Sequence, residues 1–340
     1  MKFLFEISHP SRVHNFKHVI WELQRRGHDV KIGAIKKEIT YELLNAYNLE
    51  FTELGENKPG NIIRKIPLIF EAVYNLHNIA SEFNPDVFIS SYSPISAIVS
   101  RVHGKKHIAF HDTENTGLTD PFTAPFTDII CTPNCFKRDF GKKQVRFEGY
   151  KELCYLHPKY FKPDPSVLEK INANVGDPLI VLRLVSFSAH HDIGQHGLEN
   201  PIEMIHRLEK YGRVILSSET HIPKLQQYEV KLPPEDIHSL LYYSNMYVGD
   251  GSTMATEAGV LGTPSLYISS FKGTLGNFIE LEDRYGLVYS YETDREALEK
   301  AVSILEDPNS KKVWASKREV LLKNTIDVNE FFYNLITKND

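Results

Sequence analysis

Short, continuous apolar runs alternate with segments of helical periodicity along most of this chain. The runs KFLFEI (2–7), DVFISS (86–91) and LIVLRLV (179–185) each end at a polar turn, and apolar residues recur at helical spacing from Phe16 to Leu23. Strands that read as continuous apolar runs are typically buried on both faces of a sheet. The sequence therefore predicts an α/β protein whose parallel sheets are covered by helices on both faces.

A proline-rich segment interrupts this rhythm in the middle of the chain. The segment KELCYLHPKYFKPDP (151–165) contains three prolines and is predicted to connect two domains. A chain of 340 residues is long enough for two domains with separate cores. We expect a Rossmann-like N-terminal domain over residues 1–155, a second Rossmann-like domain over 166–320, and a C-terminal helix over 321–340.

Charge and hydropathy exclude several classes of function. The formal net charge is −5 and no basic tract is present, so we expect no binding of nucleic acid. No run approaches the ~20 apolar residues of a membrane span, and the chain becomes polar too early for a signal peptide. We expect a cytoplasmic protein with at most peripheral membrane contact. The segment 62–83 is predicted to be an ordinary core helix, with docking on a lipid-linked acceptor as the alternative.

The segment MYVGDGSTMATEAGVLGTPSLYI (246–268) is the most informative for function. It predicts a strand, a tight turn at Gly251, a helix that carries Glu257, and a second strand. Helix N-termini at the carboxyl ends of parallel strands present unpaired N–H groups to anions. Ser252 and Thr253 are predicted to supply N-cap hydroxyls. A phosphate-bearing ligand fits this pattern, although the same turn would also serve simply to cap a helix.

Two polar turns of the first half carry candidate catalytic residues. His14 is predicted to lie just ahead of the first helix, where a histidine could deprotonate a hydroxyl, cap the helix or face solvent. His111, Asp112 and Glu114 follow the buried run HIAF (107–110), so we expect at least one of them to face a cleft rather than the core.

A further polar loop follows the first strand of the second half, in the segment RLVSFSAHHDIGQHG (183–197). Arg183 is a candidate for a bidentate contact with a diphosphate, and Ser186 and His190 lie on the loop beyond it. The histidines and the aspartate of this loop are types that bind divalent metals, but their spacing matches no metalloenzyme motif. We therefore predict no metal site.

The segment 246–268 resembles the donor-site segment of nucleotide-sugar glycosyltransferases and epimerases of the GT-B superfamily, in which a D/G-S-G-x-x-x-x-E run precedes G-x-P and a strand. The resemblance implies that Glu257 binds the ribose of a UDP-type donor, while Gly251, Ser252 and Thr253 cradle its phosphates. The spacing from Asp250 to Glu257 matches the pattern, and the resemblance makes Asp250 a further candidate for donor binding. The paired glycines of many relatives are replaced here by glycine and serine.

The region around His111 resembles the H-x-E segment of non-hydrolysing UDP-N-acetylglucosamine 2-epimerases, whose glutamate takes part in proton transfer. Here the spacing is H-x-x-E or D-x-E, ending at Glu114. Those epimerases carry an acidic G-D-T turn after their fourth strand, whereas this chain has the turn SSYS (90–93). The loss of that carboxylate favours sugar transfer over epimerisation, and the epimerase remains the alternative.

Three strings, ISHPSRVHNFK, YLHPKYFKPDPSVL and DGSTMATEAGVLGTP, resemble an uncharacterised and largely archaeal family of GT-B-like proteins. The resemblance covers nearly the whole chain. It implies two Rossmann-like domains that face each other across a cleft, the first on the acceptor side and the second binding a nucleotide sugar, with the last helix crossing back to the first domain.

The function implied is that of a metal-independent glycosyltransferase in polysaccharide or glycoconjugate synthesis, with His14 or Glu114 as the base. Its co-substrate would be a UDP-sugar, with no other cofactor, and its acceptor a glycan or a lipid-linked molecule. A nucleotide-sugar epimerase, a non-catalytic sugar-nucleotide binder and a homodimeric state are left open by the sequence.

Overall fold

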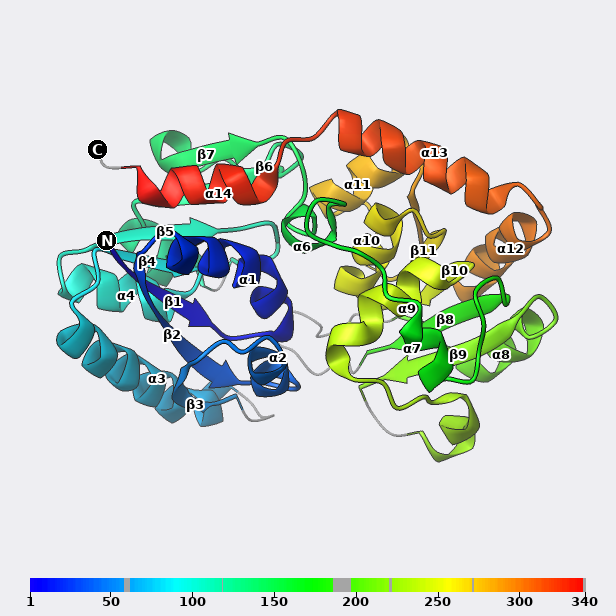
Figure 1. Ribbon diagram of the computed structural model, residues 1–340, viewed down its shortest axis with the longest axis horizontal. Helices are drawn as coiled ribbons and strands as arrows, with labels where there is room; N and C mark the ends of the chain where they lie inside the picture. The colour runs from blue at the N-terminus through cyan, green and yellow to red at the C-terminus, as the bar shows by residue number, and fades with distance from the viewer. Residues whose placement is uncertain (58–61, 118, 186–196, 220–221, 271, 339–340) are drawn as a thin grey trace. The chain divides into compact units, whose positions relative to one another are not determined.

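The computed structural model describes most of the chain, and the chain folds as two compact units. The first unit contains residues 1–155 and 326–340, and the second contains residues 156–325 (Figure 1). The residues that the structure describes are 1–57, 62–117, 119–185, 197–219, 222–270 and 272–338.

The first unit is built on a parallel sheet of seven strands with the order β3-β2-β1-β4-β5-β6-β7. The strands are β1 (Lys2–Ile7), β2 (Asp29–Lys36), β3 (Thr52–Glu56), β4 (Val87–Ser90), β5 (Lys106–Phe110), β6 (Ile129–Pro133) and β7 (Gln144–Phe147). Strand order reverses between β1 and β4, which pair with Phe3 opposite Val87. The reversal makes this the topological switch point of the sheet.

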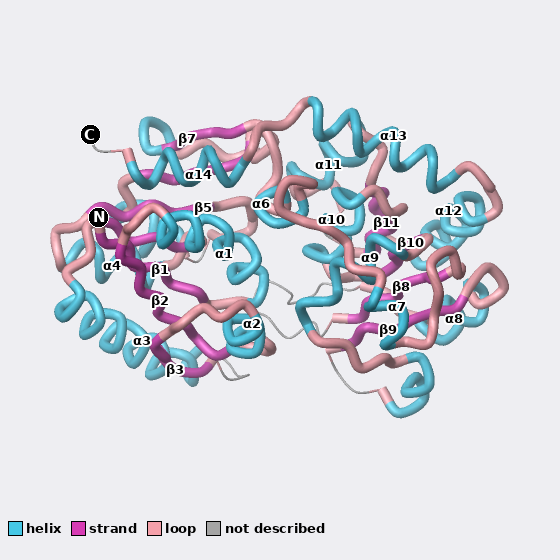
Figure 2. Tube along the Cα trace, in the orientation of Figure 1, coloured by secondary structure: helices cyan, strands magenta, loops and turns pink. Residues whose placement is uncertain are grey.

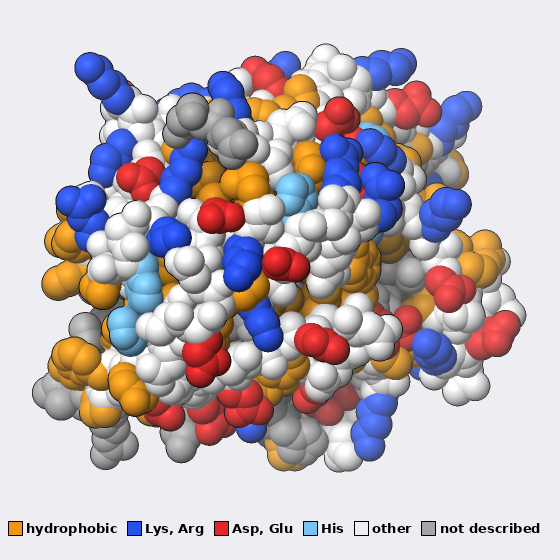
Figure 3. Space-filling view, turned by 60° about the vertical axis from the view of Figure 1, so that its left-hand side comes forward, with side chains coloured by type: hydrophobic (Ala, Val, Ile, Leu, Met, Phe, Trp, Pro, Cys, Tyr) orange, Lys and Arg blue, Asp and Glu red, His pale blue; other side chains and the backbone are white. Residues whose placement is uncertain are grey.

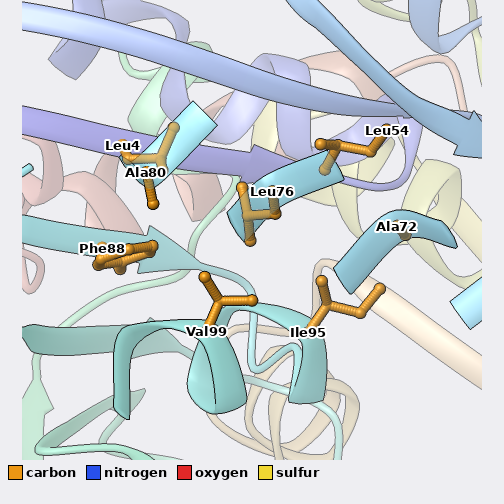
Figure 4. Close-up of a cluster of buried hydrophobic side chains, with 8 residues drawn as sticks. All are labelled: Leu4, Leu54, Ala72, Leu76, Ala80, Phe88, Ile95 and Val99. Carbon is orange, nitrogen blue, oxygen red and sulfur yellow. The ribbon is translucent and has the colours of Figure 1, made fainter. Parts of the chain in front are cut away.

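Helices cover both faces of this sheet. They are α1 (Pro10–Arg25), α2 (Thr40–Ala46), α3 (Ile62–Phe83), α4 (Pro94–Val102), α5 (Asp120–Thr123), η1 (Ala124–Phe126), η2 (Gly141–Lys143) and α14 (Val328–Thr337), and α6 (Leu153–Leu156) lies where the chain leaves the unit. On one face, α3 and α4 bury a cluster formed by Leu4, Leu54, Ala72, Leu76, Ala80, Phe88, Ile95 and Val99 (Figure 4).

The last helix belongs to the first unit. Phe332 of α14 packs against Phe110 of β5, with ring centroids 3.8 Å apart, and against Phe147 of β7 at 5.5 Å. The chain enters this helix through a hydrogen bond from the Ile326 N–H to the carbonyl of Glu148, at 3.0 Å. The expectation that the C-terminal helix returns to the N-terminal half is confirmed, and residues 321–325, expected with that helix, lie in the second unit.

The second unit is built on a parallel sheet of five strands with the order β12-β11-β10-β8-β9. The strands are β8 (Leu179–Leu184), β9 (Arg213–Ser218), β10 (Met246–Gly249), β11 (Ser265–Ile268) and β12 (Val288–Tyr291). The helices are α7 (Ser166–Lys170), α8 (Pro201–Leu208), η4 (Pro223–Tyr228), η5 (Pro234–Asp236), α9 (Ile237–Tyr243), α10 (Ser252–Leu261), α11 (Gly276–Asp283), α12 (Asp294–Leu305) and α13 (Ser310–Lys323).

Strand and helix alternate through both units, as the tube in Figure 2 shows. The predicted α/β class with two Rossmann-like parallel sheets is confirmed. Acidic and basic side chains are intermingled over much of the face shown in Figure 3, in keeping with the small net charge. In the described part of the chain, no helix is both long enough and apolar enough to cross a membrane.

We predict that Leu76→Ala lowers the free energy of unfolding by about 2–5 kcal/mol, because it leaves a cavity under α3. Leu76 is fully buried, whereas Tyr74 on the opposite side of the same helix is 65% exposed. Tyr74→Ala is therefore the matched control and should change stability by about 0.5 kcal/mol or less. Urea denaturation followed by circular dichroism measures both, and equal losses would contradict the packing described for α3.

Candidate functional site

The switch point of the second sheet lies between β8 and β10. Arg183 on β8 pairs with Gly249 on β10, and a Cβ on Gly249 would lie only 2.3 Å from the Arg183 carbonyl oxygen. Only glycine therefore allows the two strands to approach so closely at their carboxyl ends. Helix α10 begins at this edge with Ser252, so its N-terminus opens where ligands bind in sheets of this kind.

Gly251, rather than a hydroxyl residue, is the N-cap of α10. Its backbone is extended (φ −83°, ψ 102°), its carbonyl accepts the first helical hydrogen bond from Ala255 at 3.0 Å, and no side chain among the described residues caps the helix. The prediction that Ser252 and Thr253 supply N-cap hydroxyls is thus wrong, because they are already the first two helical residues. The first N–H groups of α10 remain suited to an anion.

Asp250 holds the backbone beside this turn. Its carboxylate accepts hydrogen bonds from the N–H of Val185 at 2.8 Å and of Leu198 at 3.4 Å, which flank the region 186–196. Burial raises the pKa of Asp250 to about 6, against the lowering effect of these N–H donors and of Arg183. The carboxylate predicted to help bind the donor is thus engaged by the protein's own backbone.

Arg183 lies beside the same turn with its charge already compensated. A Cβ on Gly251 would contact the Arg183 side chain at 2.9 Å, so the two are neighbours. The guanidinium donates to Ser217 Oγ at 2.9 Å and to Glu219 Oε1 at 2.6 Å. A diphosphate at the start of α10 would therefore compete with Glu219 for this cation.

Glu257 is buried in the second turn of α10 and is paired with a histidine that the sequence did not single out. Its Oε1 lies 2.9 Å from Nε2 of His238 on α9, and the two residues are 5% and 3% exposed. His238 stands among apolar residues of a short helix, and a polar side chain at such a buried position is the signal that could have found it.

Two site residues predicted in the second half of the chain stay predictions. Ser186 and His190 lie outside the residues that the structure describes. Among the described residues, no group of three or more histidine, cysteine, aspartate or glutamate side chains could hold a metal ion.

A second candidate site lies at the carboxyl ends of the strands of the first unit. A cavity of about 10 Å³ there has room for about one water-sized group. Two of its lining residues carry a buried atom, Asn15 Oδ1 and Ser91 Oγ, that has no hydrogen-bond partner among the described residues. The lining residues are Arg12, Asn15, Ser91, Phe110, His111, Asp112, Cys131, Pro133, Phe147, Lys151 and Phe332.

This cavity combines an ionised carboxylate with a neutral imidazole. Burial opposes the ionisation of Asp112, but the adjacent Lys151 ammonium, with which it forms a salt bridge, and the Arg12 guanidinium lower its pKa overall. Burial lowers the pKa of His111 to about 3, so its ring is neutral at physiological pH. The ring is stacked on Tyr92 with centroids 3.9 Å apart. Lys151 was not predicted, because it is distant from Asp112 in sequence.

His14 and Glu114 are not among the residues that line this cavity. His14 is the fifth residue of α1 and not, as predicted, ahead of the helix, because the N-cap is His9 and Pro10 is the first helical residue. Its buried ring lies against Tyr155 and Tyr47, and Tyr47 Oη is 3.3 Å from Nδ1. Glu114 Oε1 accepts from the Lys137 N–H at 3.3 Å.

Asp250 should give the protein a measurable dependence of stability on pH. The folded state retains a proton on Asp250 up to about pH 6, whereas the ordinary pKa is 3.8. Stability must therefore fall as the pH rises between these two values and level off above them. Asp250→Asn should remove about 1–3 kcal/mol of this change. Urea titrations of both proteins across this range test it, and parallel stability curves would contradict the assignment.

Comparisons with known proteins place these features in a family and a fold. A protein of Methanocaldococcus jannaschii, itself uncharacterised, is 24% identical over 273 residues, which cover 77% of this chain and 80% of that protein. The crystal structure of UDP-GlcNAc 2-epimerase from Neisseria meningitidis bound to UDP-GlcNAc is similar over the whole of both chains, with a TM-score of 0.69 and 14% identity.

The spinosyn forosaminyltransferase is similar over 99% of this chain and 100% of its own, with a TM-score of 0.67 and 14% identity. These likenesses identify the fold as GT-B. The model of the family described as "Protein of unknown function (DUF354)" matches residues 1–329. The chain therefore belongs to this family, and it has the GT-B fold.

Proposed function

We propose that this protein is a glycosyltransferase that transfers a sugar from a UDP-sugar to a hydroxyl-bearing acceptor in polysaccharide or glycoconjugate synthesis. The observation that carries the proposal is the start of α10. Its N-terminus opens at the switch point of the second sheet without a side-chain cap among the described residues, and Glu257 follows in the second turn. Proteins of similar fold include a sugar transferase and an epimerase bound to UDP-GlcNAc.

In the proposed donor site, the diphosphate binds the first N–H groups of α10 beside Ser252 and Thr253. The partial positive charge of a helix N-terminus favours an anion there. The Glu257 carboxylate accepts hydrogen bonds from ribose hydroxyls. A buried carboxylate favours ligands that carry hydroxyl donors over ligands that lack them. A ligand without hydroxyls forms no hydrogen bond with the charged group.

Arg183 supplies the cation for the leaving group in this proposal. When the glycosidic bond to the donor breaks, negative charge grows on the departing diphosphate, and fixed donors near it stabilise the transition state. The guanidinium contacts Glu219 at 2.6 Å, and the Arg183 side chain that carries it lies beside the turn at Gly251. A diphosphate would take part of that contact and place its charge between helix and arginine.

The acceptor would bind in the first unit, at the cavity lined by Asp112. The partnerless Asn15 Oδ1 and Ser91 Oγ would each accept from a hydroxyl donor, and the cavity has room for one such group. Asp112 replaces His14 and Glu114 as the preferred base. It is the ionised carboxylate of that cavity, and a base must come within hydrogen-bond distance of the proton that it removes.

An epimerase is the second candidate, and the pair of His111 and Asp112 favours it. Both line the cavity, and an epimerase needs acid and base groups around a sugar ring. The turn after β4, which comprises Ser91, Tyr92 and Ser93, has no carboxylate to complete such a set. Transfer is therefore the preferred proposal.

The donor site is tested by nucleotide binding. We predict that the wild-type protein binds UDP and that Glu257→Gln weakens this binding by about tenfold or more, because a charged hydrogen bond is worth about 1.5–3 kcal/mol. Glu299→Gln, in an exposed pair with Arg295, is the matched control and should bind like the wild type. Isothermal titration calorimetry measures all three, and equal affinities for the wild type and Glu257→Gln would refute the donor site.

The type of reaction is tested with UDP-N-acetylhexosamines and no acceptor. Transfer predicts that the donor stays intact until a glycan or a lipid-linked acceptor is added, and that Asp112→Asn then abolishes turnover while it preserves UDP binding. An epimerised sugar in the absence of acceptor, either still attached to UDP or released together with free UDP, would instead establish the epimerase. Chromatography of the nucleotides and NMR of the configuration at C2 of the sugar distinguish the two outcomes.

A further inference from the structure

A buried histidine contacts the carboxylate on which the proposed donor site depends. Oε1 of Glu257 on α10 lies 2.9 Å from Nε2 of His238 on α9. The side chains are 6% and 3% exposed, so the contact is shielded from water. The proposed function requires Glu257 as a carboxylate, whose oxygens accept hydrogen bonds, so Nε2 is assigned as the donor of this hydrogen bond.

The imidazole is itself fixed in position. Phe161 packs edge-on against it, with ring centroids 6.3 Å apart and ring planes at 88°. Leu240 and Leu241, on the same short helix, are buried and anchor α9. A ring held by an aromatic edge and by a buried helix presents its N–H in one direction, which limits the orientations that the Glu257 carboxylate can adopt.

We infer that His238 is a positioning residue for Glu257 and thereby determines the preference of the donor site for ribose. This inference rests on the proposed function, in which Glu257 binds the ribose hydroxyls. Each carboxylate oxygen can accept two hydrogen bonds, so the histidine holds one lone pair of Oε1 and sets the plane of the group without preventing a sugar hydroxyl from binding.

Such a role differs from a merely structural link between α9 and α10. A structural link would stabilise the fold and affect every ligand equally. A positioning residue acts only on ligands that reach Glu257, that is, on ligands with ribose hydroxyls. The difference in affinity between UDP and 2′,3′-dideoxy-UDP isolates that role, because both carry the same base and diphosphate and only UDP offers hydroxyls to the carboxylate.

The experiment compares this difference among variants. His238→Phe keeps an aromatic ring beside Phe161 and removes the donor, whereas His238→Gln retains an N–H donor at a similar reach. We expect wild type to prefer UDP by about tenfold or more, His238→Phe to lose most of that preference, and His238→Gln to keep it within about threefold. Binding of the dideoxy nucleotide should stay unchanged in all variants. His206→Phe, at an exposed position of α8, is the matched control.

The outcomes separate the two proposals. If the wild type fails to distinguish the two nucleotides, the ribose site of the proposed function is wrong. The positioning role is refuted by a different set of results. In that case the wild type prefers UDP over the dideoxy nucleotide, Glu257→Gln loses this preference, and His238→Phe keeps it in full.

A measurement on the wild-type protein covers the case in which His238→Phe does not fold. The imidazole ¹⁵N shifts should report a protonated Nε2, and they should change on addition of UDP but not of inorganic pyrophosphate. A bare Nε2, or shifts that UDP leaves unchanged, would also overturn the inference.

Discussion

The close approach of β8 and β10 is the constraint on which the second unit depends. In an open parallel sheet, ligands bind in the crevice at the carboxyl edge where the strand order reverses. Here the pairing continues to Arg183 and Gly249, where a side chain larger than hydrogen would collide with the opposite carbonyl. The chain must then turn at once, and it does so through a second glycine into α10.

The polar side chains around this edge already have hydrogen-bond partners within the protein. Asp250 is engaged by two backbone N–H groups, Arg183 by Glu219, and Glu257 by His238. Each contact satisfies a group that would be costly to bury alone. In the proposed site, a diphosphate would therefore bind by exchange and replace part of the Glu219 contact, while the carboxylate of Glu257 would keep its contact with His238 when it binds a ribose.

The order of strands and helices could be predicted because it is encoded locally. The order of β10, α10 and β11 could be predicted from an apolar run, a glycine turn and a glycine at the end of the helix. Helix α3 begins and ends at the predicted residues. Local statistics misled at the helix starts. Serine and threonine are preferred N-caps, but the backbone of Gly251 takes that position. The proline that starts α1 was readable from the sequence and places His14 inside the helix.

The pairs that define the chemistry of both sites were beyond a reading of local pattern. Asp112 meets Lys151 across the end of the first sheet, and Glu257 meets His238 between two helices. In neither pair do the two residues lie at a sequence spacing that signals a contact, because sheet order and helix packing bring them together. Sequence could therefore nominate one member of each pair, and only the fold supplies the second.

The return of α14 to the first unit has a consequence for biosynthesis. The chain leaves that unit after residue 155 and re-enters it at 326, so the whole second unit is inserted between two parts of the first. While the ribosome is still adding residues, the rings of Phe110 and Phe147 lack the Phe332 that covers them. The part of the protein that is synthesised first is thus completed only after the whole second unit has been made, and its apolar surface stays uncovered until Phe332 has been added.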